Sequence, residues 1–186
     1  FRLLRLVNSM SAAEYLSDSQ TLSLRDADLV KLVSEVCESS ADLAEQLGIQ
    51  LKFVCAMDRR VCAIHPAAVE QMLYHLLSNA LKFTPAGGAV TVELKKSGET
   101  LRLTVSDTGC GIPEVYQRSI FQPFFRVDKS RSREYGGAGL GLSLVWEIAD
   151  LHGGSVWVEE SSDKGTTIAV ELPAGAENDS SSVDAP

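Results

Sequence analysis

Helical periodicity marks several stretches of this chain. Near its start, apolar residues at positions 3, 6, 10 and 13 follow a 3-4-3 spacing, which predicts an amphipathic helix over residues 1–17. A helix of this length is unstable alone in water, so we expect it to pack against a partner helix. Start and stop signals around other apolar stripes predict three more helices, from Asp28 to before Gly48, from Pro66 to about Thr84, and from about Leu140 to His152.

Shorter runs of apolar and β-branched residues alternate with polar ones and predict strands. Polar or glycine-containing segments separate neighbouring runs, as expected for tight turns. A short helix is predicted after Pro113. The order of the runs predicts three antiparallel pairs, residues 49–56 with 60–64, 89–96 with 100–107, and 155–161 with 165–173.

The mixture of helices and antiparallel strands predicts an α+β fold, a two-layer sandwich with a mixed, mostly antiparallel sheet. Residues 28–173 contain these elements and predict one domain, as suits a chain of 186 residues. Residues 18–27 are polar and lack periodicity, so we expect a linker between the N-terminal helix and this domain. Residues 174–186 predict a disordered acidic tail.

Composition narrows the class of protein. Hydrophobic residues make up 45% of the chain and charged residues 23%, which is typical of a globular domain. The net charge is −8, or −5 without the acidic residues of the tail, so general binding to nucleic acid is not expected. We find no signal-peptide pattern, no membrane-spanning run and no C-x-x-C pair. These features predict a soluble, cytoplasmic piece with reduced thiols.

A column of polar side chains interrupts the apolar stripe of the helix predicted over residues 66–84. His75, Asn79 and Lys82 recur at i, i+4 and i+7, which places them on one helix face. The amide oxygen of Asn79 suits Mg²⁺, which takes few protein ligands when phosphates and water supply the others. Lys82 can approach a phosphate oxygen, and Phe83 either flanks a base or belongs to the core.

Two glycine-rich motifs lie at element boundaries. In DTGCGIP, Asp107 ends a strand, where its carboxylate can accept a hydrogen bond from an amine such as that of adenine. Gly109 and Gly111 let the backbone pass close to a flat ligand, although an ordinary turn explains this motif equally well. In YGGAGLGL, glycines lead into a helix N-terminus, which suits phosphate. No strand leads directly into this motif and it lacks G-K-[ST], which excludes a dinucleotide fingerprint and a P-loop.

The stretch between these motifs, FQPFFRVDKSRSREY, is basic inside an acidic protein. Its aromatic residues Phe121, Phe124 and Phe125 are expected to anchor the base of a loop. A solvated charged loop is the ordinary explanation of such a run. The flanking glycine motifs favour instead a mobile lid over a phosphate. The basic side chains of this lid are Arg126, Lys129, Arg131 and Arg133.

The order of these motifs resembles that of sensor histidine kinases. YHLLSNALKFT, DTGCGIP, FQPFFRVD and GGAGLGL are similar to the N, G1, F and G2 boxes of that family, and residues 151–161 and 163–173 continue the likeness. Four ordered boxes are far more specific than any one of them. The resemblance covers residues 28–173 and implies the Bergerat-type, ATP-binding catalytic fold of the GHKL superfamily, shared more distantly with gyrase, Hsp90 and MutL ATPases.

The resemblance also implies roles for individual residues. Catalytic roles fall to Asn79 as the Mg²⁺-binding amide, Lys82 as a phosphate-contacting lysine, and Arg126 as the F-box arginine near the terminal phosphate. Asp107 resembles the adenine-binding aspartate, and Thr166 the threonine beside it. The other residues expected to bind ATP are His75, which is also a possible metal ligand, Phe83, Gly109, Gly111, Ile112, Phe121, Gly137, Ala138, Gly139, Leu140, Gly141 and Leu142.

Two positions depart from the family pattern. His75 stands where the N box usually has asparagine. Three interpretations stay open: His75 is a neutral polar substitute, it makes Mg²⁺ coordination pH-sensitive, or it acts as a general base for ATP hydrolysis. Ala138 stands where threonine or serine is common, which removes one hydroxyl contact.

The phosphoacceptor motif of the family, an H-E-x-R-x-P-like sequence, does not occur here. Residues 1–17 therefore resemble the second helix of a dimerisation hairpin whose first helix carries the phosphorylated histidine. His65, His75 and His152 all lie within the predicted ATP-binding domain, and His152 is most simply a helix-end residue.

These observations together predict the catalytic fragment of a protein histidine kinase. It is expected to bind Mg²⁺ and ATP and to transfer the γ-phosphoryl group to the hairpin histidine in two-component signalling. The expected partners are that hairpin and a response regulator, with a homodimer for the full-length protein, whose membrane attachment the sequence leaves open. The alternatives are an impaired pseudokinase, or a GHKL-type ATPase, against which the lack of glutamate at position 75 argues.

Overall fold

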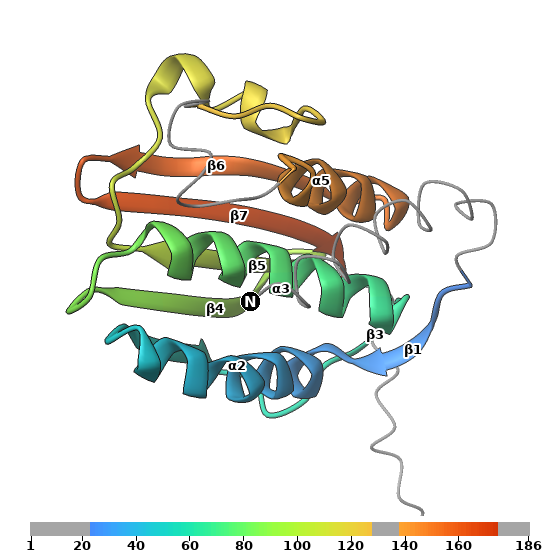
Figure 1. Ribbon diagram of the computed structural model, residues 1–186. Coiled ribbons are helices and arrows are strands. Elements are labelled where there is room, and N and C mark those ends of the chain that lie inside the picture. The colour runs from blue at the N-terminus through green and yellow to red at the C-terminus, as the bar shows by residue number, and fades with distance from the viewer. Residues whose placement is uncertain (1–22, 128–137, 175–186) are drawn as a thin grey trace, which may run out of the picture.

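A five-stranded sheet forms one layer of the protein (Figure 1). The computed structural model describes residues 23–127 and 138–174. The strand order is β2-β4-β5-β7-β6, with β2 parallel to β4 and the other pairs antiparallel. The strands are β2 (Gln50–Cys55), β4 (Ala89–Ser97), β5 (Thr100–Asp107), β6 (Ser155–Ser162) and β7 (Gly165–Pro173).

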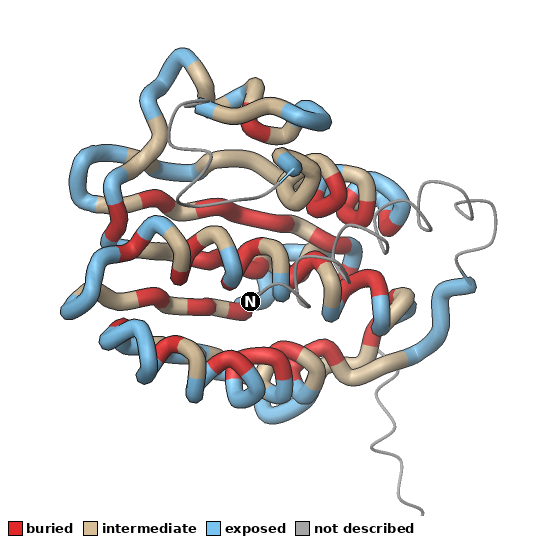
Figure 2. Tube along the Cα trace, in the orientation of Figure 1, coloured by how far each residue is buried: buried red, intermediate tan, exposed pale blue. Residues whose placement is uncertain are grey.

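Three long helices, α2 (Leu29–Gln46), α3 (Pro66–Phe83) and α5 (Gly141–Leu151), form the second layer on one face of the sheet (Figure 1). Their inner faces and the central strands are buried against each other (Figure 2). The start signals act as predicted, because Asp28 Oδ1 accepts from the N–H of Val30 at 3.1 Å and Pro66 opens α3. The α+β class, these helices and the two hairpins β4–β5 and β6–β7 are confirmed.

The strands of the sheet bury alternate side chains. In β4 and β5 the inward set, Val92, Leu94, Leu103 and Val105 among them, is no more than 3% exposed. The opposite face is polar, and there Arg102 forms ion pairs with Glu159 and Glu171. This alternation is typical of an antiparallel sheet covered on one side only, and it fixes the register of the strands.

The hairpin predicted between residues 49–56 and 60–64 is wrong. β2 pairs with β4, whereas β3 (Val61–Ile64) pairs antiparallel with a strand that the pattern did not predict, β1 (Arg25–Asp28). Asp28 explains this pairing, since its Oδ1 accepts from the N–H of Arg60 at 3.1 Å while also capping α2. Residues 25–27, expected in the linker, thus belong to a second, two-stranded sheet.

Other segments differ from expectation in smaller ways. The short helix predicted after Pro113 consists of two 3₁₀ turns, η1 (Glu114–Tyr116) and η2 (Ser119–Phe121). Ala174, expected to begin the tail, is buried, and its N–H donates to Glu99 O at 2.9 Å. The predicted N-terminal helix and the rest of the tail lie outside the described residues. Within the described part of the chain, no helix is both long and apolar enough to cross a membrane.

Two histidines join the start of α3 to the end of α5. His65 is the N-cap of α3, where its Nδ1 accepts from the N–H of Ala68 at 3.2 Å. His152 is the C-cap of α5 and is buried. Its Nε2 accepts from the N–H of His65 at 3.0 Å, so its Nδ1 must carry the proton that it donates to Ile148 O at 2.6 Å. The arrangement therefore requires neutral His152, and burial lowers the pKa of this imidazole.

The free energy of unfolding is expected to fall as pH drops below about 6.5, the ordinary pKa of an unfolded histidine. Below that pH, unfolded His152 takes up a proton that the folded chain does not bind until its lowered folded pKa is reached. Urea denaturation at neutral and acidic pH measures the change. His152→Gln keeps one donor and one acceptor without titrating, so its pH dependence should be shallower. An equally steep dependence in that variant would contradict this role.

Candidate functional site

The second half of α3 and the first turn of α5 meet at His75 and Gly141. A Cβ on Gly141 would lie 3.2 Å from His75 Nδ1, so glycine permits this close approach. Nε2 of His75 is buried and has no hydrogen-bond partner among the described residues. Burial also lowers the pKa of the imidazole, which favours the neutral ring. Because an unsatisfied buried nitrogen is costly, we expect this atom to have a partner that the described residues do not supply.

The remaining polar residues of the α3 column follow His75 toward the helix end. Asn79 and Lys82 are both half-buried, and Lys82 Nζ lies 4.9 Å from the centroid of the Phe83 ring. Phe83 is 46% exposed, so it is not a core residue. Its carbonyl oxygen would lie 2.4 Å from a Cβ on Gly109, which brings the end of α3 against the DTGCGIP turn.

The polar side chains of α3 suit Mg²⁺ that is shared with a phosphate better than a metal ion held by protein ligands alone. In the described ranges, no group of three or more histidine, cysteine, aspartate or glutamate side chains could hold a metal ion. Asn79 offers a neutral amide oxygen on a half-buried face. A hard cation that takes most of its ligands from phosphate and water needs little more from the protein.

Asp107, at the end of β5, holds two backbone groups with one carboxylate oxygen. Its Oδ1 accepts from the N–H of Gly109 at 2.8 Å and from the N–H of Thr166, its partner on β7, at 3.3 Å. Burial raises the pKa of Asp107, and these two hydrogen bonds oppose that rise. The described contacts thus fix the carboxylate through Oδ1 and leave Oδ2 to accept from a ligand.

The DTGCGIP turn lies directly against β6 and β7. Gly111 has a φ of +71°, and a Cβ there would lie 1.8 Å from Ser162 O. The N–H of Ile112 donates to Ser161 Oγ at 2.7 Å, and Ser161 Oγ lies 2.9 Å from Thr166 Oγ1. Sequence reasoning missed Ser161, and only its place at the end of the family-like segment 151–161 points to it.

The start of α5 has two features that suit an anion. Its N-cap, Leu140, makes no side-chain capping bond, and the first turn carries no acidic residue. The N–H groups of such a turn suit phosphate. Gly139, with a φ of +73°, accepts from the N–H of Phe124 at 2.9 Å, which ties this motif to the FQPFFRVD segment. Leu142 is half-buried, Ala138 is exposed, and Gly137 lies outside the described residues.

The FQPFFRVD segment anchors on two of its three phenylalanines. Phe121 packs against the core, and the Phe125 ring lies 5.8 Å from that of Tyr116. Phe124 does not anchor the segment as predicted, since it is 71% exposed with a φ of +62°. Arg126 is half-buried at its end. The other basic residues of the predicted lid, at positions 129, 131 and 133, lie outside the described residues.

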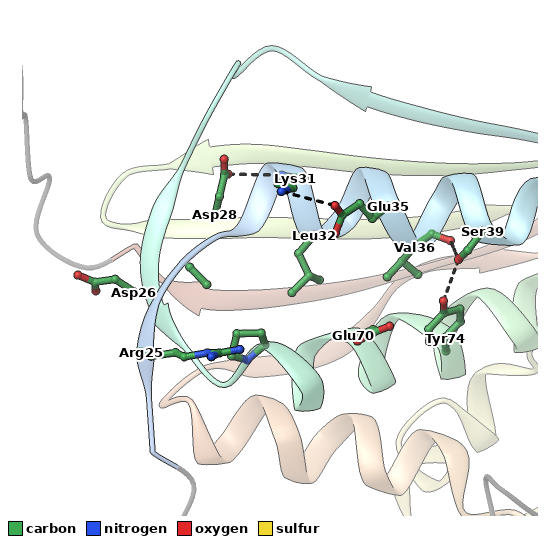
Figure 3. Close-up of a pocket in the computed structure, with 12 residues that line it drawn as sticks. Arg25, Asp26, Asp28, Lys31, Leu32, Glu35, Val36, Ser39, Glu70 and Tyr74 are labelled. Atoms are coloured by element: carbon green, nitrogen blue, oxygen red, sulfur yellow. Dashed lines mark hydrogen bonds and ion pairs between the residues drawn. The ribbon is translucent and has the colours of Figure 1, made fainter.

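A groove of about 640 Å³ lies elsewhere, between β1, α2 and α3 (Figure 3). Its walls include Leu32 and Val36 of α2 with Glu70 and Tyr74 of α3, and Tyr74 Oη lies 2.8 Å from Ser39 Oγ. These α3 residues belong to the first half of the helix, whereas the predicted site residues lie on the second half. Since the groove contains neither glycine motif, we place the candidate nucleotide site at the other end of α3.

Comparison with known proteins identifies the family of this chain. The family described as histidine kinase-, DNA gyrase B-, and HSP90-like ATPase matches residues 64–176. The circadian input-output histidine kinase CikA of Synechococcus elongatus is 35% identical over 174 residues, 92% of this chain and 23% of CikA. The sensor histidine kinase WalK of Bacillus subtilis is 33% identical over 177 residues, 92% of this chain and 28% of WalK.

Solved structures give the same result for the fold. The nucleotide-free catalytic domain of histidine kinase ThkA has a TM-score of 0.73 at 26% identity, covering 82% of this chain and 96% of that one. Full-length ShkA in complex with AMPPNP has a TM-score of 0.80 at 29% identity, covering 94% of this chain and 36% of that one.

The chain therefore belongs to the family of histidine kinase-, DNA gyrase B-, and HSP90-like ATPases. The relatives named above are histidine kinases, and the Bergerat-type fold implied by the resemblance is confirmed. The chain spans about a quarter of the length of these curated relatives.

Proposed function

We propose that this chain binds ATP with Mg²⁺ and, within a longer sensor histidine kinase, transfers the γ-phosphoryl group to a histidine. One observation carries the proposal. Three features border one region: the carboxylate of Asp107, the uncapped start of α5 and the polar column of α3. The close approach of Gly109 to Phe83 brings the Asp107 turn to α3, and that of Gly141 to His75 brings α5 to α3. A nucleotide needs an acceptor for the amine of its base and a site for its phosphates, such as the N-terminus of a helix.

Each side chain has a distinct part in this proposal. Asp107 Oδ2 accepts from the adenine amine, and the Asn79 amide oxygen would hold Mg²⁺, which neutralises phosphate charge when bound. Lys82 and Arg126 stabilise the negative charge of the terminal phosphates. The lowered pKa of His75 favours a neutral ring near neutral pH. A neutral ring suits both a polar substitute for asparagine and a base, and it argues against a metal ligand whose binding changes with pH in that range.

Phosphoryl transfer by this site depends on position and charge. Such reactions need little covalent participation from the protein, so the main tasks are to hold the terminal phosphate, exclude water and accept docking of the target histidine. We propose a dimerisation hairpin as the carrier of that histidine, a homodimer for the parent protein, and a cytoplasmic location for this domain. A response regulator is the proposed downstream partner, since ThkA has been solved in complex with the response regulator protein TrrA.

Incubation with ATP labelled in the γ position tests this function. The chain is mixed with the hairpin of its parent protein, and with the same hairpin whose histidine is replaced by alanine. Transfer predicts acid-labile label on the first hairpin and none on the second. Steady release of phosphate without label on either hairpin would favour a GHKL-type ATPase. ATP binding with neither outcome would identify a pseudokinase.

A further inference from the structure

The groove between β1, α2 and α3 lies apart from the proposed nucleotide site and has an apolar floor (Figure 3). Leu32 and Val36 point from α2 toward α3, and Tyr74 of α3 is 38% exposed. Ala27 and Pro66 extend the apolar lining to the β1 end. A volume of about 640 Å³ can take several apolar side chains of one helix, but not a folded domain.

The chain passes this groove immediately after the residues that the structure does not describe at its start. Arg25 and Asp26 line the groove, and only residues 18–24 separate them from the helix predicted over residues 1–17. Seven extended residues span up to about 23 Å. The lining residues of α3 lie between Pro66 and Tyr74, which is about 12 Å along the helix. The predicted helix can therefore reach either end of the groove.

The surface of the predicted helix matches that of the groove. Its apolar stripe at positions 3, 6, 10 and 13 needs an apolar partner. Residues 1–17 contain two arginines and one glutamate, so this segment is net basic. The groove is net acidic, since four acidic and two basic side chains line it: Asp26, Asp28, Glu35, Glu70, Arg25 and Lys31. Opposite charges favour association, although such exposed charges contribute less than the apolar contact.

We propose that this groove is the docking surface for residues 1–17 of the same chain. Docked there, the apolar stripe is buried against Leu32, Val36 and Tyr74. The first half of α3 then carries the docked helix, while its second half carries Asn79 of the proposed nucleotide site. Because residues 1–17 resemble a helix of the dimerisation hairpin, a movement of the hairpin acts directly on α3. The docking itself does not rest on the proposed function.

Hydrogen exchange of the full chain, measured by mass spectrometry without nucleotide, tests the docking. A helix of this length is unstable alone, so docking should make the backbone amides of residues 1–17 exchange at least about tenfold slower than in a synthetic peptide of the same sequence. Leu6→Asp places a charge in the middle of the stripe and should remove this protection. Asn8→Asp adds the same charge on the opposite face of the predicted helix and should keep it.

Substitutions in the groove test the other side of the contact. Tyr74→Lys should also remove the protection, because Tyr74 is an exposed part of the groove wall. If that variant fails to fold, Glu70→Arg, at an exposed position of the same wall, should lower the protection by reversing a charge. Trp146→Lys is the matched control, since Trp146 is an exposed aromatic residue of α5 that does not line the groove. It should leave the protection unchanged.

Three results would overturn the docking. Residues 1–17 of the parent chain could exchange as fast as the peptide. Protection that survives both Tyr74→Lys and Glu70→Arg would place the helix elsewhere, and protection that falls on dilution would show that a second copy of the chain holds it. Failure to bind ATP, with the protection intact and groove-dependent, would contradict only the proposed function.

Discussion

Asp107→Asn is expected to weaken ATP binding by about 100-fold while the chain stays folded. An amide oxygen can accept from the N–H groups of Gly109 and Thr166 as Asp107 Oδ1 does, at 2.8 Å and 3.3 Å. The other carboxylate oxygen becomes an NH₂ group, which faces the adenine amine as a second donor. Losing a charge-assisted hydrogen bond and leaving a donor unpaired costs about 3 kcal/mol, or roughly two factors of ten in affinity.

Calorimetric titration of ATP measures this effect, and thermal denaturation shows whether the variant is folded. Asp163→Asn is the matched control, because Asp163 is exposed in the turn between β6 and β7. The control should bind ATP as the parent does. A folded Asp107→Asn variant that binds ATP within about threefold of the parent would contradict the assignment of Asp107.

Gly111→Ala is expected to destabilise the fold by more than about 3 kcal/mol, because it adds a steric clash to backbone strain. A Cβ at position 111 would lie 1.8 Å from Ser162 O, a backbone atom that cannot move without shifting β6. The turn that carries Ile112 would then separate from Ser161, so ATP binding should be lost as well.

Gly98 provides the comparison that separates strain from the clash. Its φ of +61° is close to the +71° of Gly111, but a Cβ there would meet nothing within 4 Å. Gly98→Ala should therefore cost only about 1–2 kcal/mol of left-handed strain and leave ATP binding unchanged. Urea denaturation of both variants measures the difference. Equal losses of stability would show that the contact with Ser162 does not matter.

Local signals in the sequence predicted most elements of the fold. The Asp28 cap, Pro66 and the apolar stripes place α2, α3 and α5, since each of these signals acts within one or two helical turns. The pairing of β2 could not be predicted in this way. Its partner β4 lies beyond α3 in the chain, and the nearer strand β3 is drawn to β1 by the contacts of Asp28. Tertiary contacts, rather than closeness in the sequence, therefore decide the partner of β2.

The candidate site also contains features that local sequence predicts and features that depend on tertiary contacts. Glycine motifs and the polar column of α3 are visible in sequence because they depend on backbone freedom and on helical spacing. The contact of Ser161 with Ile112 was missed because its hydroxyl meets this turn only after β6 and β5 join the same sheet. Phe124 was misjudged for a similar reason, because its positive φ turns an expected anchor outward.

The structure bears on one of the three interpretations of His75, the pH-sensitive metal ligand. Its spacing with Asn79 left three roles open. The ring lies against Gly141, at the first turn of α5, and is buried there, which favours its neutral form. Neither spacing nor residue type contains that information.

Calorimetric titration of ATP with and without Mg²⁺ tests the central claim most directly, applied to the parent chain, Asn79→Ala and the neighbouring exposed control Ser78→Ala. We predict that Mg²⁺ tightens binding by about tenfold or more in the parent and in Ser78→Ala, but not in Asn79→Ala, whose affinity without metal stays normal. Binding indifferent to Mg²⁺ in the parent would contradict the metal role of Asn79. No binding of ATP at all would contradict the interpretation of all four boxes.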